Sequence, residues 1–72
     1  MRKNNLRKFR TQLDLSQVKL AVLAHCSRAT IIWIERLGHY PTPGVRSKLA
    51  KGLGMTEAVI WPSLEVKDGH TD

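Results

Sequence analysis

The chain has 72 residues, 42% of them hydrophobic, which suits one small globular domain and excludes a multi-domain enzyme. It has no apolar run near the roughly 18 residues that a membrane span needs, and its single cysteine excludes an internal disulfide. No apolar stretch of the signal-peptide kind follows the basic N-terminal residues. We therefore expect a cytoplasmic protein without a membrane partner.

The net charge of +6 is concentrated in the first half of the chain. Residues 1–36 contain eight lysines or arginines and two acidic residues, whereas residues 37–72 contain four of each. This excess favours an acidic partner. Nucleic acid fits better than a membrane, because the charges surround a compact motif and do not follow one continuous amphipathic helix. A basic surface that only confers solubility is the alternative.

The apolar spacing predicts a first helix near the N-terminus. After a frayed basic arm at residues 1–4, a helix is expected from Asn5, with Leu6, Phe9 and Leu13 on one apolar stripe.

A second helix is predicted over residues 17–24. Ser16 can cap its free backbone N–H groups, and Leu20, Ala21 and Ala24 form its inner face. A small residue at position 21 would let the next helix approach closely, as a crossed helix pair requires.

A third helix is predicted over residues 28–37, after a turn of about three residues, with Ser27 as its cap and Gly38 at its end. A helical wheel divides it into two faces. The inner face contains Thr30, Ile31, Ile34 and Leu37, and the outer face contains Arg28, Ala29, Ile32, Trp33 and Arg36. The outer face has no evident reason to be buried.

Two further helices complete an all-α fold, a compact bundle of about five short helices. The fourth has Thr42 as its cap, Pro43 at its first position, and Val45, Leu49 and Leu53 on its inner face. The short fifth has Thr56 as its cap and apolar cover from Val59, Ile60 and Trp61, with Trp61 as a core plug. The domain is expected to span residues 1–61, followed by a flexible tail at residues 62–72.

No catalytic or metal site is predicted, and no cofactor. The chain has no Gly-rich phosphate loop, no Ser, His and Asp constellation and no carboxylate cluster. His25 and Cys26 are adjacent, but neighbouring side chains on a turn rarely face the same way and further ligands are lacking. Cys26 is better explained as an apolar contact that fixes the turn against the core. We expect a protein that is not an enzyme.

Four segments carry a resemblance to a known family. They are LSQVKLA at residues 15–21, SRATIIWIE at residues 27–35, the Pro41 and Thr42 step, and KLAKGLGM at residues 48–55. Together they resemble the Cro/C1-type (XRE) helix-turn-helix family, a lambda-repressor-like fold, over residues 6–61. The resemblance implies a transcriptional regulator, with repression as the expected direction. It would bind double-stranded DNA as a homodimer and place its third helix in the major groove.

The resemblance also implies roles for individual residues. Gln17 would contact a DNA phosphate, helped by the positive end of its helix, while the outer face of the third helix would meet the bases or the adjoining backbone. Arg36 and His39 would approach phosphates. The expected DNA-binding residues are Gln17, Ser27, Arg28, Ala29, Ile32, Trp33, Arg36 and His39. A structural pair of Arg10 and Glu35 would fix the third helix. The alternative is two independent surface charges, since exposed pairs contribute only about 0–1 kcal/mol.

Three positions depart from the family pattern. His25 stands where glycine is usual, which costs about 1 kcal/mol if the backbone there is left-handed. Ile32 and Trp33 replace polar residues, so base recognition could rest on apolar contact with thymine methyl groups. The alternative is a protein-interaction adapter, such as an antitoxin that holds its toxin through these two side chains.

Two further assignments stay open. Arg28 could bind the O6 and N7 edge of guanine or only a phosphate. The basic residues Arg2, Lys3, Arg7 and Lys8 could reach the DNA backbone or form a solvated basic face.

Overall fold

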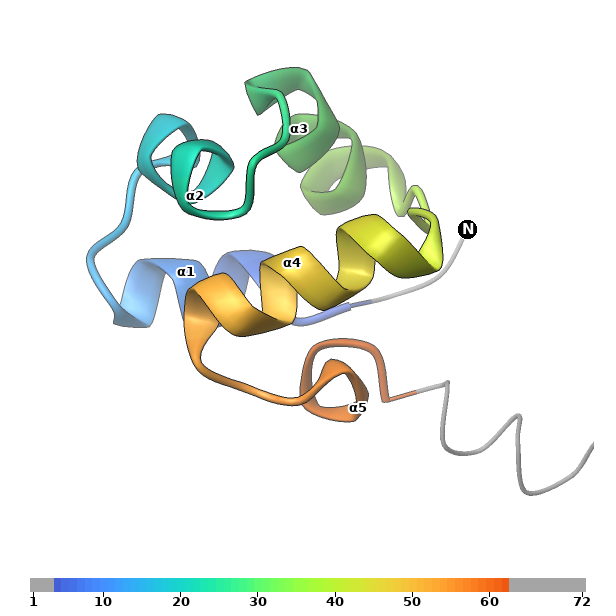
Figure 1. The fold of residues 1–72 in the computed structure, drawn as a ribbon. Helices are drawn as coiled ribbons and strands as arrows, with labels where there is room; N and C mark the ends of the chain where they lie inside the picture. Colours follow the sequence, from blue (N-terminus) through green and yellow to red (C-terminus); the bar gives the residue numbers. More distant parts are fainter. Residues whose placement is uncertain (1–3, 63–72) are drawn as a thin grey trace, which may run out of the picture.

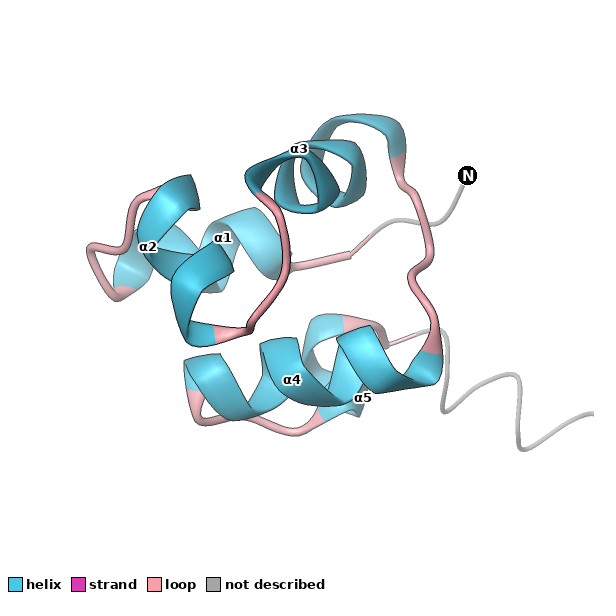
Figure 2. Ribbon diagram, turned by 45° about the horizontal axis from the view of Figure 1, so that its top comes forward, coloured by secondary structure: helices cyan, strands magenta, loops and turns pink. Residues whose placement is uncertain are grey.

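Five helices make up the part of the protein that the structure describes. The computed structural model describes residues 4–62, with α1 at Leu6–Gln12, α2 at Gln17–Leu23, α3 at Arg28–Leu37, α4 at Pro43–Leu53 and α5 at Glu57–Ile60. The all-α prediction is confirmed. Helices α2 and α3 lie on one side of α4 and α5 lies on the other (Figure 1). The loop from α3 to α4 runs down one side of the bundle (Figure 2). Within residues 4–62, no helix is long and apolar enough to cross a membrane.

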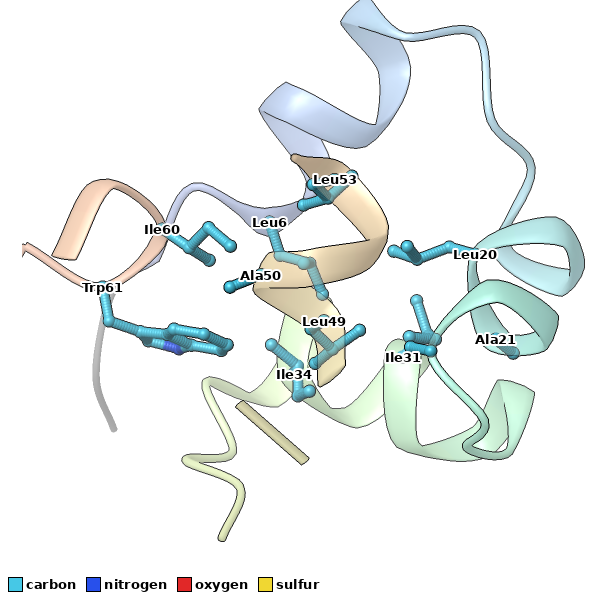
Figure 3. Packing of buried hydrophobic residues seen from close by; sticks show 11 residues of the cluster. Leu6, Leu20, Ala21, Ile31, Ile34, Leu49, Ala50, Leu53, Ile60 and Trp61 are labelled. Carbon is cyan, nitrogen blue, oxygen red and sulfur yellow. The ribbon is translucent and has the colours of Figure 1, made fainter. Parts of the chain in front are cut away.

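Each helix contributes at least one side chain to a single apolar core (Figure 3). The buried residues that form this core are Leu6, Leu20, Ala21, Ala24, Ile31, Ile34, Leu49, Ala50, Leu53, Ile60 and Trp61. Trp61 has no exposed surface, so its prediction as a core plug is confirmed. Its ring meets the edge of the Tyr40 ring at a centroid distance of 6.3 Å. Burying a large apolar side chain contributes about 1.5–3 kcal/mol, and a domain this small needs every one of them.

Two of the four predicted side-chain caps form. The Ser16 hydroxyl accepts a hydrogen bond from the Lys19 N–H at 3.0 Å, and the Ser27 hydroxyl accepts one from the Thr30 N–H at 3.1 Å. Thr42 and Thr56 stand at the predicted N-cap positions, but their side chains make no cap hydrogen bond. At α4, the proline at the first helical position already removes one free N–H group and fixes φ. At α5, a single turn is closed by backbone bonds such as Val59 N–H to the Thr56 carbonyl.

Helices α1, α2 and α4 end in the same way. Asp14, His25 and Gly54 adopt left-handed conformations, with φ of 57°, 53° and 69°. The next residue then donates its N–H to a carbonyl five residues back, as Cys26 does to Ala21 at 3.0 Å. This bond is the one that characterises the Schellman motif, which satisfies the last carbonyls of a helix. His25, which stands where the family pattern has glycine, therefore does have a left-handed backbone.

The start of α1 is anchored, so the predicted frayed arm is wrong at Asn4. The Asn4 side chain donates to the Ile34 carbonyl at 3.0 Å and accepts from the Leu6 N–H at 3.0 Å. The Asn5 N–H donates to the Ile60 carbonyl at 2.8 Å. These bonds tie the beginning of α1 to α3 and α5. The rest of the predicted arm, residues 1–3, and nearly all of the predicted tail, residues 63–72, lie outside the described residues.

Three side chains that the apolar pattern placed inside are exposed. The exposed fractions are 46% for Leu13, 57% for Leu37 and 43% for Val59. Leu13 and Leu37 stand at the ends of α1 and α3, where the helix leaves its neighbour although the periodicity continues. In α5, Ile60 and the following Trp61 already cover the core, so Val59 stays outside.

Candidate nucleic-acid interface

A compact helix-turn-helix unit is formed by α2, the turn at residues 24–27, and α3. Leu20 and Ala21 of α2 pack beside Ile31 of α3 (Figure 3). The small side chain of Ala21 lets the two helices approach closely. Cys26 lies partly buried against the core, and this burial raises the pKa of its thiol, while Lys48 acts in the opposite direction. The unit is thus fixed at its turn as well as along its helices.

The outer face of α3 is a stripe of solvent-exposed side chains. Arg28, Ala29, Trp33 and Arg36 are exposed, as the wheel predicts, whereas Ile32 is half-buried. About half of Trp33 is exposed, with an exposed fraction of 49%. A helix of this width fits the major groove of B-DNA, which is about 12 Å wide. The stripe offers one cation at its start, apolar contacts in its middle and a second cation near its end.

Trp33 is held from one side by His39. Their rings meet edge to face, with centroids 6.3 Å apart and planes at 80°. Gly38, with φ of 70°, turns the chain back across the end of α3, and the His39 N–H donates to the Trp33 carbonyl at 3.2 Å. His39 was expected only near a phosphate, and its contact with Trp33 is an addition that the sequence did not indicate.

The ion pair between Arg10 and Glu35 is present and largely buried. Arg10 Nε and Glu35 Oε2 are 2.6 Å apart, and Arg10 Nη2 donates to Glu35 Oε1 at 3.1 Å. Only 11% of the Arg10 side chain and 3% of the Glu35 side chain are exposed. Arg10 Nη1 also donates to the Leu15 carbonyl at 2.7 Å. The two charges are therefore paired and not independent, and the pair bridges α1, α3 and the loop before α2.

A polar cavity of about 120 Å³ opens beside this pair. We call it the arginine notch; its lining residues are Arg7, Arg10, Gln17, Glu35 and Arg36. Gln17 Nε2 donates to Glu35 Oε1 at 3.3 Å. Among residues 4–62, Arg7 and Arg36 have no acidic partner, so the notch has an uncompensated positive charge. Such a site suits an anion the size of a phosphate group.

The remaining candidate contacts are Ser27 and three N-terminal basic residues. The Ser27 hydroxyl is occupied by its cap and lies 2.9 Å from the Thr30 hydroxyl. Lys8 lies over the Phe9 ring at 5.6 Å and is not among the residues that line the notch. Arg2 and Lys3 lie outside the described residues. Among described residues, no group of three or more His, Cys, Asp or Glu side chains could hold a metal ion.

Sequence reasoning missed two features of this surface. Arg7 was grouped with the other N-terminal basic residues, but it lines the notch with Gln17 and Arg36. The bond from Gln17 to Glu35 joins the start of α2 to the last turn of α3. A short-range pattern cannot show either feature, because both depend on how α1, α2 and α3 cross.

Comparisons with known proteins agree on this unit. A family model described as a helix-turn-helix domain matches residues 4–60. Among solved structures, the chain is similar to a hypothetical transcription factor, NHTF, from Neisseria, with a TM-score of 0.71 and 25% sequence identity. The match covers 93% of this chain and 78% of that one. No curated protein sequence matches the chain significantly.

Proposed function

Because the chain belongs to the helix-turn-helix domain family and has an XRE-like sequence and fold, we propose that it is a repressor that binds specific sequences in double-stranded DNA. The observation that carries this proposal is the exposed outer face of α3 beside the arginine notch. One feature can read base edges and the other can hold the DNA backbone. The family is one of DNA-binding domains, which also argues against an enzyme.

Base recognition is assigned to α3 in the major groove. Arg28, at the first turn of α3, is exposed and can reach the O6 and N7 atoms of guanine. Ala29, Ile32 and Trp33 can contact thymine methyl groups, with the Trp33 ring steadied by His39.

Backbone contacts are assigned to the residues that flank this face. Gln17 and Arg36 line the notch and can hold a phosphate there. Ser27 and His39 are exposed at the two ends of α3 and can approach neighbouring phosphates. These contacts would set the register of the helix without reading sequence.

One copy reads only a few base pairs, so we propose a homodimer acting on two half-sites about one helical turn apart, roughly 34 Å. It would act in the cytoplasm, at the nucleoid. Selection from a random duplex pool at moderate salt tests specificity and spacing together. The expected product is an inverted repeat, and a pool with no enriched motif would contradict sequence-specific regulation.

The variant Arg28→Ala tests base reading. If Arg28 binds guanine, the substitution should weaken binding by about 1–3 kcal/mol and relax the preference at one base pair. Titration onto the selected site and onto its single-base variants measures both effects. Lys51→Ala, an exposed change on α4, is the matched control and should leave binding unchanged. A uniform loss across all sequences would instead make Arg28 a phosphate contact.

A second candidate function is the protein-interaction adapter that was expected to use Ile32 and Trp33. Ile32 is half-buried, but Trp33 is 49% exposed and Leu37, one turn further along α3, is 57% exposed. Large exposed apolar side chains on one flank of a helix are suited to a protein partner, as in an antitoxin adapter. A stable complex with a co-expressed toxin that shifts the Trp33 fluorescence, without measurable DNA affinity, would favour this function over the first.

A further inference from the structure

The Gln17 side chain can be placed in only one orientation. Its amide offers a carbonyl oxygen, which accepts, and an NH₂ group with two donor protons. The neighbouring Glu35 carboxylate only accepts, so it faces the NH₂ group, with Gln17 Nε2 3.3 Å from Glu35 Oε1. One proton of Nε2 is therefore engaged, and the second is left for another acceptor.

The carboxylate that sets this orientation is itself fixed. Glu35 is held by two hydrogen bonds from Arg10, and only 3% of its side chain is exposed. Arg10 is anchored in turn on the Leu15 carbonyl. The orientation of Gln17 is thus determined by α1 and α3, although Gln17 itself belongs to α2.

We propose that Glu35 is a positioning residue that orients the Gln17 amide to donate to a DNA backbone phosphate in the arginine notch. Arg7 and Arg36, which line the same cavity, supply the charge that balances the phosphate. This inference rests on the proposed function. Glu35 lies in α3, the helix assigned to base recognition. It anchors that helix and also orients the amide that donates to the phosphate, so the base contacts and the phosphate contact form together.

The orientation is tested in the free protein, without DNA. In a ¹H–¹⁵N NMR spectrum, the Gln17 side-chain amide is identified by its loss in Gln17→Ala. Its two protons should be widely separated, and one should exchange slowly with water. Gln12, exposed on α1, is the matched control amide. A Gln17 amide that behaves like that of Gln12 overturns the orientation.

The effect on binding is tested by a double-mutant cycle on the selected DNA site. Gln17→Ala should weaken binding about tenfold in the wild-type background, the scale of a hydrogen bond to a charged group. In the Glu35→Gln background the same change should cost less than twofold. An equal loss in both backgrounds would show that Glu35 acts only on stability, and overturns the proposal.

Two outcomes of this double-mutant cycle require a further measurement. If Glu35→Gln does not fold, Gln17→Asn replaces it, since its amide is one methylene shorter and loses contact with Glu35. It should bind as weakly as Gln17→Ala, and wild-type affinity for Gln17→Asn overturns the proposal. If no variant binds any duplex, the proposed function fails and the phosphate role fails with it, while the NMR result still decides the orientation.

Discussion

His25 ends α2 in a backbone conformation that most residues avoid. Its φ of 53° costs a side chain about 1 kcal/mol relative to glycine. We expect His25→Gly to raise the free energy of unfolding by about that amount, measured by urea denaturation. Asp14→Gly is the matched control, because aspartate at φ of 57° can bond locally and should gain less. Equal or absent gains at both sites would contradict this account.

The Cys26 thiol should make stability depend on pH in alkaline solution. Burial raises its pKa above the ordinary value, so the folded protein holds this proton more tightly than the unfolded chain. This stabilisation is present below the pKa of the thiol in the unfolded chain, which is about 8.5. It is lost as the pH rises from there through the higher pKa of the thiol in the folded protein. The free energy of unfolding should therefore fall more steeply there in the wild type than in Cys26→Ala. Parallel curves would exclude this role.

At the scale of the helices, the two ion pairs differ mainly in the burial of the carboxylate. The Glu35 side chain is 3% exposed and that of its partner Arg10 is 11% exposed, whereas the Glu57 side chain is 35% exposed and that of its partner Arg46, 3.2 Å away, is 14% exposed. Arg10→Ala leaves a buried carboxylate without its cation and should cost about 3 kcal/mol or more in stability. Glu57→Ala, the matched control, should cost less than about 1 kcal/mol. Thermal unfolding followed by circular dichroism separates the two, and similar losses would contradict the burial argument.

The helices themselves could be predicted because their signals are local. Ser16 and Ser27 each cap a helix that begins at the next residue, and the bond spans only three positions. Leu37 shows the limit of this reasoning, because it continues the apolar periodicity of α3 and is nevertheless 57% exposed. Its exposure depends on packing, which no single helix encodes.

The candidate site could be predicted in part for the same reason. The outward positions of Arg28 and Trp33 follow from the period of one helix. The bond from Gln17 to Glu35 joins two residues that are 18 positions apart on different helices, and the notch also needs α1. Such a feature follows from the crossing of three helices, so only the folded chain could reveal it.

Across the whole molecule, the two sides of α4 have different roles. On the α5 side, the Arg46 guanidinium lies 4.5 Å from the centre of the Tyr40 ring and donates to the Pro41 carbonyl at 2.8 Å. Together with the Glu57 pair, these contacts hold the loop after α3 against α5. On the other side, Arg7 and Arg36 have no acidic partner among residues 4–62. Two cations without an acidic partner thus lie on the side assigned to DNA.

This division predicts how binding depends on salt. A plot of log K against log salt has a slope of about −0.9 for each phosphate that the protein neutralises. Arg36→Ala should reduce the magnitude of the slope by about 1, because it removes a cation from the notch. Gln17→Ala should weaken binding at every salt concentration with the slope unchanged, because a neutral amide releases no counterion. Lys51→Ala, which changes the net charge equally but on α4, should alter neither. If Lys51→Ala changed the slope as much as Arg36→Ala, net charge and not the notch would govern binding.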